Sequence, residues 1–339
     1  MDDASRLAAP LRLGRIEIPN RVFLAPMSGV TDEPFRARAV RHGAGLVVSE
    51  MVASGELAKG RRNSALRIRR PDVPVHVVQL AGREAGFMAE GARIAAGEGA
   101  DIIDINMGCP AKKVTGGYCG SALMRDPDHA LSLIEAVVGA VSVPVTVKMR
   151  LGWDRDCLNA PEIARRAEAA GVAMVTVHGR TRCQLYNGRA DWRAIRAVKE
   201  AVSVPVVANG DVECLADAME MLRQSGADAV MVGRSHYGAP WLAGRIAAEA
   251  AGSAVASEFD ISDYVIDHYE DMLMFYGIEQ GLRHARKHLG WYLGRHAPET
   301  PVELRRTAMT ATDPAAVVEA LRAAFSAGGL RSAAIRSAA

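Results

Sequence analysis

The sequence contains no apolar run long enough to cross a membrane. Its longest stretch without a charged residue covers twelve residues, 136–147, and is interrupted by Gly139 and Pro144, whereas a membrane helix needs about 20 apolar residues. The N-terminus also lacks the basic and then apolar pattern of a secretory signal. We therefore expect a cytoplasmic protein that has no membrane partner.

Cysteines are few, and their spacing argues against two kinds of site. The five cysteines form no C-x-x-C pair and are odd in number, whereas a full disulfide framework needs paired cysteines and a zinc site needs closely spaced ligands. We expect neither a disulfide framework nor a bound metal. The net charge of +2 is also too small to indicate a nucleic-acid partner by itself. The cysteines are at positions 109, 119, 157, 183 and 214.

Short β-branched runs recur along the first 235 residues. Segments of helical periodicity lie between them, and several begin at capping signals such as Asp126-Pro127. Continuously apolar strands that alternate with helices indicate a parallel sheet covered on both faces. Eight such units in this length match a (β/α)8 TIM barrel better than an open sheet. The runs are 22–28, 45–51, 75–82, 101–108, 145–152, 174–181, 206–212 and 229–235.

The β pattern stops near residue 245, and a different pattern follows. The small-residue stretch 248–260 resembles a linker, and helical periodicity continues after it. We therefore expect a barrel domain over residues 1–244 and a small all-helical C-terminal domain over residues 255–339.

Every predicted strand ends in residues that are polar or have special backbone conformations. In a parallel barrel, the carboxyl ends of the strands meet at one mouth, where active sites lie. We therefore expect these residues to line a single active site. They are Pro26, Met27, Ser28, Glu50, Gln79, Asn106, Cys109, Lys148, Arg150, His178, Asn209, Gly210, Asp211, Gly233 and Arg234.

The last two strand ends indicate a phosphate site. Segments 209–211 (Asn-Gly-Asp) and 233–234 (Gly-Arg) end the seventh and eighth strands, where many barrels bind a phosphate. No G-x-G-x-x-G opens a helix, so a Rossmann nicotinamide site is not indicated. Gln79, Asn106 and Lys148 can hydrogen-bond a polar heteroaromatic ring, and together with the phosphate site they suggest flavin mononucleotide (FMN). The alternative to a phosphate site at 209–211 is a simple turn. The alternative to a flavin contact at Lys148 is a solvated lysine at a strand end.

Nine segments of the chain resemble the sequence motifs of a known family. They are APMSGVTDEPFR (25–36), SEM (49–51), QLAG (79–82), DINMGCPAKKV (104–114), KMRLGW (148–153), HGRTRCQLYNG (178–188), ANGD (208–211), MVGR (231–234) and RKHLGWYL (286–293). In this order they resemble the tRNA-dihydrouridine synthase family, nearest its bacterial B-type branch. NMGCPAKK together with HGRTR is the most specific part of the resemblance.

The resemblance implies an enzyme that uses NADPH to reduce the carbon 5–carbon 6 double bond of uracil in the D-loop of tRNA. It also implies that Cys109 is the general acid of the reaction. The FMN contacts that it implies are Pro26, Met27, Ser28, Gln79, Lys148, Asn209, Gly210, Asp211, Gly233 and Arg234.

The chemistry of this reaction explains why a thiol would be useful. Hydride addition to carbon 6 leaves a carbanion at carbon 5, which needs a proton. An ordinary thiol, with a pKa of about 8.5, is mostly protonated at neutral pH and can supply it. Alternative roles for Cys109 are a nucleophile activated by His178, a zinc ligand and a buried structural thiol. We interpret Cys119 as structural.

Several other polar residues have open roles. His178 and Arg180 either contact the flavin or orient the substrate, and a structural role for the histidine is an alternative. Glu50 and Arg150 either orient uracil or form an ion pair at the mouth.

Two basic regions are candidate contacts for RNA phosphates. Residues 59–70 carry six basic side chains, and Arg283, Arg286 and Lys287 are spaced to share one helix face. For residues 59–70 the alternative is a run of solvated charges with no partner. For the other three cations the alternative is ion pairs with Asp267, Glu270 and Asp271 of the first predicted tail helix.

Two other functions fit parts of this pattern. One is an FMN barrel that acts on free pyrimidines, as a dihydroorotate dehydrogenase does. The other is a non-catalytic RNA-binding or regulatory protein on the same scaffold. The basic helical tail and NMGCPAKK favour the tRNA enzyme, and no feature indicates an oligomeric state.

Overall fold

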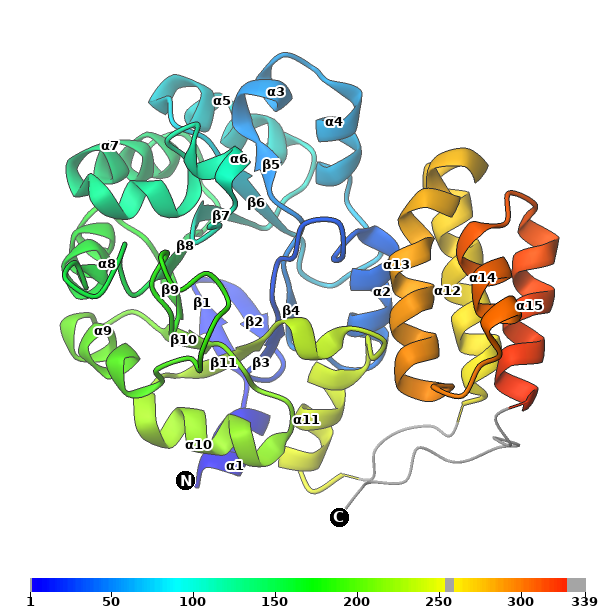
Figure 1. Cartoon of the computed structure of the whole chain (residues 1–339). Helices are drawn as coiled ribbons and strands as arrows, with labels where there is room; N and C mark the ends of the chain where they lie inside the picture. The colour runs from blue at the N-terminus through cyan, green and yellow to red at the C-terminus, as the bar shows by residue number, and fades with distance from the viewer. Residues whose placement is uncertain (1, 254–258, 328–339) are drawn as a thin grey trace.

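Parallel strands close into a barrel in the computed structural model, which describes residues 2–253 and 259–327. Figure 1 shows the barrel along its axis. The sheet order is β4-β3-β11-β10-β9-β8-β7-β6-β5, and each pairing is parallel. The TIM barrel predicted from the sequence is therefore confirmed. The strands are β3 (Val22–Leu24), β4 (Leu46–Val47), β5 (Val52–Ala53), β6 (Val77–Ala81), β7 (Ile102–Met107), β8 (Val145–Arg150), β9 (Met174–His178), β10 (Val206–Asn209) and β11 (Ala229–Val232).

The second barrel position is divided between β4 and β5, where the sequence predicts one continuous strand. Val48 bridges to Val77, and the backbone N–H of Ser49 donates to the Val77 carbonyl at 3.0 Å. The Ser49 hydroxyl then accepts from the backbone N–H of Gln79 at 3.0 Å. A side-chain oxygen thus takes the place of a ladder carbonyl. The strand can bend here while β4 still pairs with β3 and β5 with β6.

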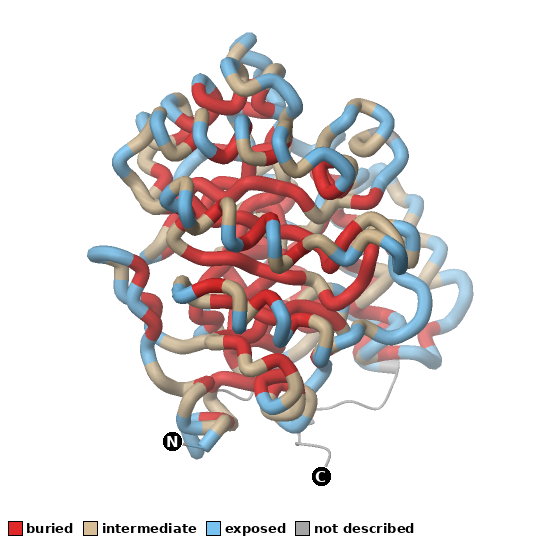
Figure 2. The backbone as a smooth tube through the Cα atoms, turned by 90° about the vertical axis from the view of Figure 1, so that its left-hand side faces the viewer, coloured by how far each residue is buried: buried red, intermediate tan, exposed pale blue. Residues whose placement is uncertain are grey.

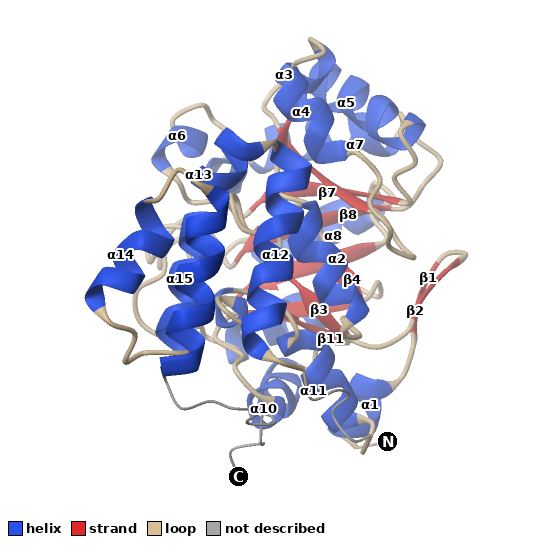
Figure 3. Cartoon of the chain, turned by 90° about the vertical axis from the view of Figure 1, so that its right-hand side faces the viewer, coloured by secondary structure: helices blue, strands red, loops and turns tan. Residues whose placement is uncertain are grey.

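A hairpin that the sequence analysis did not predict closes the amino-terminal end of the barrel. Its strands are β1 (Leu11–Leu13) and β2 (Ile16–Ile18), paired antiparallel. Leu13 and Ile18 pack in one buried cluster with residues of the barrel strands, such as Ile102. Figure 3 shows this hairpin at one end of the barrel and α6 (Lys112–Thr115) at the other. The carboxyl ends of the strands therefore form the open mouth.

Helices surround the barrel and leave the strands in the interior, as Figure 2 shows by burial. The helix α7 begins where the sequence predicts, because Pro127 occupies its first turn and Asp126 accepts from the backbone N–H of His129 at 3.0 Å. The α-helices before the tail are α1 (Asp3–Ala8), α2 (Glu33–Arg41), α3 (Ser54–Ala58), α4 (Arg62–Ile68), α5 (Ala85–Gly97), α7 (Pro127–Val138), α8 (Ala160–Ala169), α9 (Arg196–Ala201), α10 (Leu215–Ser225) and α11 (Leu242–Ala250). Short 3-10 helices are η1 (Gly120–Arg125), η2 (Arg193–Ile195) and η3 (Arg234–His236).

Four helices follow the barrel and pack beside α2, at the right of Figure 1. They are α12 (Ile261–Tyr276), α13 (Ile278–His296), α14 (Val302–Thr310) and α15 (Pro314–Ala327). The predicted helical tail after the barrel is confirmed. The predicted start of a separate domain at residue 255, part of the predicted linker and the end of the chain lie outside the described residues.

None of the helices within residues 2–253 and 259–327 is long and apolar enough to cross a membrane.

Candidate active site

A cavity of about 770 Å³ opens at the carboxyl ends of the barrel strands. All twelve residues that the sequence predicts as cofactor contacts line it, as do Cys109, Arg150 and Arg180. The residues expected at the strand ends therefore line one cavity, with the exception of Glu50. Glu50 and the predicted cations of α13 are not among the lining residues.

Two amide side chains form one wall of the cavity. Asn106 Nδ2 donates to Gln79 Oε1 at 2.7 Å, and both side chains are buried. Asn106 Oδ1 accepts from the backbone N–H of Cys109 at 3.0 Å. The wall is thus connected directly to the loop that carries the thiol.

Cys109 lies in a tight loop after β7. Its carbonyl accepts from the Ser121 hydroxyl at 2.9 Å and from the Ser121 backbone N–H at 3.1 Å. Gly120 has a φ of +59°, and a Cβ added there would lie 2.8 Å from the Cys109 carbonyl oxygen. A larger residue at position 120 would therefore displace the loop. Cys119, in the same segment, does not line the cavity.

Lys148 is a half-buried cation on the floor of the site. Its Nζ donates to Asn209 Oδ1 at 3.0 Å. Burial and, to a smaller extent, the nearby Arg150 lower the pKa of Lys148 to about 8, against the opposing effect of Asp104. A partly desolvated ammonium interacts strongly with any negative charge that develops on a bound ring.

The ends of β10 and β11 form a corner of unpaired backbone donors. Within the described part of the chain, the N–H groups of Gly210, Asp211, Gly233 and Arg234 donate to no other residue. Gly210 and Asp211 both have positive φ, at 129° and 60°. Converging N–H groups beside an arginine are typical of an anion site.

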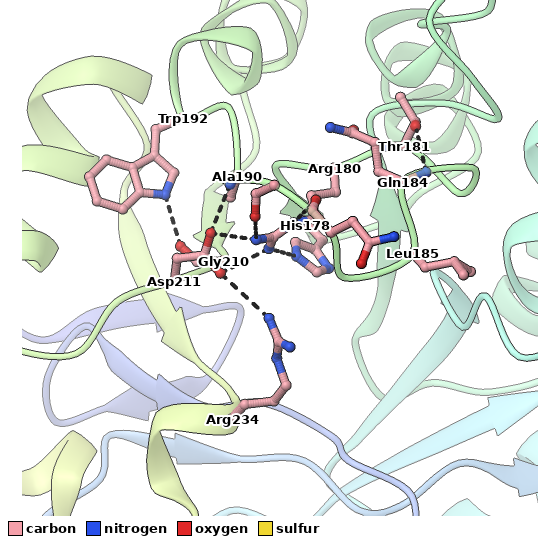
Figure 4. A network of polar contacts seen from close by, with 12 residues as sticks. His178, Arg180, Thr181, Gln184, Leu185, Ala190, Trp192, Gly210, Asp211 and Arg234 are labelled. Atoms are coloured by element: carbon pink, nitrogen blue, oxygen red, sulfur yellow. Dashed lines mark hydrogen bonds and ion pairs between the residues drawn. The ribbon is translucent and has the colours of Figure 1, made fainter.

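The buried Arg180 and the half-buried Asp211 form an ion pair next to this corner, shown in Figure 4. Arg180 donates to both carboxylate oxygens of Asp211, at 2.9 and 2.6 Å, and Arg234 lies 3.7 Å from the same carboxylate. The side chain of Arg180 is only 2% exposed. It therefore stabilises the turn after β10, and Arg234, with 46% of its side chain exposed, is the freer cation.

The arginine also defines the protonation of His178. Arg180 Nη1 lies 3.2 Å from His178 Nε2. A guanidinium can only donate, so this ring nitrogen accepts and the proton of the neutral ring is on Nδ1. Burial lowers the pKa of His178 well below its ordinary value, as do the surrounding cations, Lys148 first among them. The imidazole is thus neutral, which makes it a poor candidate for an acid at neutral pH.

Arg150 and Glu50 do not pair with each other. Arg150 is 1% exposed and donates to the carbonyls of Gly108, Thr181 and Leu185 at 2.7 to 2.8 Å. Glu50 accepts from the backbone N–H of Gly29 and lies 3.9 Å from Arg67 Nε. It lines a second, smaller cavity between the barrel and the helices α12 and α13.

The three predicted cations of α13 have different surroundings. Arg283 is exposed and pairs with Glu279 of the same helix at 2.8 Å, whereas Arg286 is half-buried. Lys287 lies against the loop after β3, where a Cβ added to Gly29 would lie 3.2 Å from its Nζ. Burial lowers the pKa of Lys287, while Asp32 and Glu50 raise it. These side chains therefore do not form one uniform exposed face.

Tyr186 lines the cavity but was not predicted. Its ring is 50% exposed and lies 4.7 Å from the Arg234 guanidinium carbon and 5.4 Å from that of Arg150. Its position in an irregular loop, eight residues after β9, explains why strand-end reasoning missed it. The available signal was an aromatic residue within the HGRTRCQLYNG segment.

The residues of the cavity fit FMN better than a metal. The unpaired N–H corner suits a phosphate, and the amide wall with Lys148 suits a ring with polar edges. Among the residues that the structure describes, no cluster of three or more His, Cys, Asp or Glu side chains could hold a metal ion.

Comparisons with known proteins agree with this geometry. The family model "Dihydrouridine synthase (Dus)" matches residues 23–328. The "Probable tRNA-dihydrouridine synthase" of Rhizobium leguminosarum bv. phaseoli is 61% identical over 93% of this chain and 98% of its own. The "tRNA-dihydrouridine synthase B" of Xanthomonas axonopodis pv. citri is 48% identical over 84% and 87%.

Solved structures resemble the barrel at low identity. Morphinone reductase covers 75% of this chain over 91% of its own, with a TM-score of 0.52 and 15% identity. Histamine dehydrogenase from Rhizobium sp. 4-9 covers 74% over 49%, with a TM-score of 0.56 and 14% identity. These two structures support the fold alone, whereas the family model and the close relatives identify the family. The chain belongs to the dihydrouridine synthase family.

Proposed function

We propose that this enzyme reduces the carbon 5–carbon 6 double bond of uracil in the D-loop of tRNA, with FMN as cofactor and NADPH as reductant. The observation that carries the proposal is one cavity that combines a donor corner, a polar amide wall, a half-buried lysine and a thiol. The close relatives are named as tRNA-dihydrouridine synthases, which supports tRNA as the substrate.

The cavity residues would hold FMN at its two ends. The N–H groups after β10 and β11, with Arg234, would bind the phosphate, and Pro26, Met27 and Ser28, after the neighbouring strand β3, would contact the flavin beside it. Gln79, Asn106 and Lys148 would hydrogen-bond the ring. When bound, FMN supplies hydride transfer from NADPH to carbon 6 of uracil.

Cys109 completes the reduction in this proposal. Its Sγ proton goes to carbon 5 of uracil, the thiol becomes a thiolate, and solvent returns the proton afterwards. Neutral His178 stays out of this step, since Arg180 occupies its Nε2. Arg150 holds the carbonyls of the mouth loops and so shapes the place where the base enters.

We assign catalysis to residues 1–244 and tRNA binding to residues 255–339, aided by the basic segment 59–70. Two placements support this. The helix α4, within the basic segment, follows the carboxyl end of β5 at the mouth, and Arg67 of α4 lines the same small cavity as Gln280 and His284 of α13. The two basic regions are thus neighbours.

Two measurements test the proposal. The purified protein should be yellow and release FMN on denaturation, and tRNA from a strain without the protein should lose dihydrouridine at a defined D-loop position. Flavin binding with turnover of free dihydroorotate and intact tRNA dihydrouridine would indicate the free-pyrimidine alternative. Absence of flavin after reconstitution would refute the FMN site and favour a non-catalytic RNA-binding protein.

A further inference from the structure

A buried carboxylate lies behind the amide wall of the cavity. Asp104 is in the middle of β7 and is only 4% exposed. It does not line the cavity. An acidic residue in the middle of a buried strand is costly unless its oxygens are satisfied, so its partners define its role.

Both carboxylate oxygens accept hydrogen bonds from neighbouring strands. Asp104 Oδ1 accepts from the Thr146 hydroxyl at 2.5 Å, and Oδ2 accepts from Gln79 Nε2 at 2.7 Å. Burial raises the pKa of Asp104, and the opposing effects of these hydrogen bonds and of Lys148 leave it at about 6. The group is therefore mostly ionised at neutral pH, where it can only accept hydrogen bonds.

This carboxylate determines which way two amides point. An amide has a donor end and an acceptor end. Because Asp104 accepts, the nitrogen of Gln79 faces it, and the oxygen of Gln79 faces Asn106. Asn106 must then present its nitrogen to Gln79, which leaves its oxygen for the backbone N–H of Cys109 at 3.0 Å. The acceptor at Asp104 thus fixes the orientation of both amides, and three hydrogen bonds connect it to the Cys109 loop.

We propose that Asp104 is a positioning residue for the reaction, which orients the Gln79 and Asn106 amides and thereby holds the loop of Cys109 in place. The inference rests on the proposed function, since it assigns these residues a task at the flavin and the uracil. Without the carboxylate, both amides can flip together. A flipped Asn106 would point its nitrogen at the Cys109 N–H, so donor would face donor and the loop would move.

The test compares two substitutions of similar size. In Asp104→Leu no acceptor remains, and we expect kcat of the flavin-loaded enzyme on tRNA to fall by about tenfold or more, with KM for tRNA changed less than about twofold. In Asp104→Asn the new amide oxygen can accept from Gln79 while its nitrogen donates to the Thr146 hydroxyl. We expect this variant to retain kcat within about threefold of the wild type.

A second readout needs no cofactor. Iodoacetamide should alkylate Cys109 several times faster in flavin-free Asp104→Leu than in the flavin-free wild type, measured on the Cys109 peptide by mass spectrometry. Asp228→Asn is the matched control, because Asp228 binds Lys199 and the Val206 N–H near the other end of the barrel, both at 2.8 Å. It should lower Tm without changing kcat or the alkylation rate.

Asp104→Leu with lowered Tm but unchanged kcat and alkylation would reduce Asp104 to a structural role and overturn the inference. If that variant does not fold, Asp104→Asn combined with Thr146→Val replaces it, since the new amide nitrogen then has no partner at position 146. We expect its kcat to fall about fivefold or more below that of Asp104→Asn; equal kcat values overturn the inference. A wild type without flavin or tRNA reduction refutes the proposed function itself.

Discussion

Cys109 is half-buried at the edge of the cavity, and hydrogen bonds hold its loop from two sides. Asn106 accepts from its N–H, and Ser121 donates to its carbonyl. No residue in the described part of the chain hydrogen-bonds the thiol itself, so it is free to approach a substrate. Cys119, ten residues later, donates to the Gly117 carbonyl at 3.3 Å. Cys109 thus lines the cavity with an unbonded thiol, whereas Cys119 lies outside the cavity and its thiol is hydrogen-bonded.

At the residue scale, we predict that Cys109→Ala separates the two half-reactions. Flavin binding and NADPH oxidation by oxygen should stay intact, because the flavin contacts remain. Reduction of tRNA should fall by about 10²–10⁴, as expected for loss of a general acid. Single-turnover reduction of tRNA by the pre-reduced enzyme measures this step directly.

Cys119→Ala is the matched control and should retain tRNA reduction. Equal loss of flavin binding and tRNA reduction in Cys109→Ala would instead make Cys109 a structural or flavin residue.

The helices α2 and α12 form the junction between the barrel and the tail. Phe35 of α2 packs against the rings of His268 and His288, with centroids 5.9 and 5.6 Å away. Arg38 pairs with Asp271 of α12. Asp32 caps α2 by accepting from the Phe35 N–H at 3.1 Å and also accepts from the Tyr276 hydroxyl of α12 at 3.1 Å. One carboxylate therefore joins both helices.

At the element scale, we predict that the free energy of unfolding depends on pH through Asp32. Burial and, to a smaller extent, the nearby Glu50 raise the pKa of Asp32 from its ordinary 3.8 to about 7. The folded protein thus binds this proton more tightly than the unfolded chain, so the stabilisation is complete below about pH 4 and is lost as pH rises through 7. Relative to Asp32→Asn, the wild type should lose about 1–3 kcal/mol of unfolding free energy between pH 4.5 and 8.

Urea unfolding of both proteins at the two pH values measures this difference. Asp260→Asn, the same change at the exposed N-cap of α12, should show no such loss. A wild-type-minus-variant difference at Asp32 that is constant with pH would contradict the prediction.

The whole molecule carries its candidate RNA contacts on the mouth side, whereas the hairpin closes the opposite end. The salt bridges of segment 59–70 are long or exposed, such as Arg61 to Glu56 at 3.5 Å, and exposed pairs of this kind contribute only about 0–1 kcal/mol. Its cations are therefore available to an anionic partner. The structure shows no pairing of the α13 cations with Asp267, Glu270 or Asp271 within the described residues.

At the scale of the whole molecule, we predict that tRNA binding depends on salt through the α13 cations. Arg283→Ala, Arg286→Ala and Lys287→Ala should each weaken binding about equally across tRNA sequences. Each should also flatten the slope of log affinity against log salt by up to about one. Titrations at two or more ionic strengths give the slopes, and bound flavin should stay unchanged.

Arg12→Ala is the matched control, because Arg12 is an exposed cation on the hairpin. It should leave the slope as it is. If the slopes of all three α13 variants equal that of the wild type, the tRNA surface lies elsewhere.

The features that the sequence alone predicts are those that depend on local patterns. Strand and helix periods, capping residues and the length of the repeat are properties of short segments, so eight parallel strands and a helical tail could be inferred. The ends of parallel barrel strands must meet at one mouth, which is why Gln79, Lys148, Asn209 and Arg234 were correctly expected around a single cavity.

Only the tertiary structure decided where the side chains at these positions point and what they contact. Glu50 and Gln79 were both expected at the mouth, but Glu50 lies between β4 and β5 and contacts Gly29 and Arg67 instead of lining the cavity. Tyr186 reaches the site because its loop folds back over the mouth. Asp104 joins the site through hydrogen bonds to residues 25 and 42 positions away. Such contacts depend on distances between segments far apart in the chain, which no local pattern encodes.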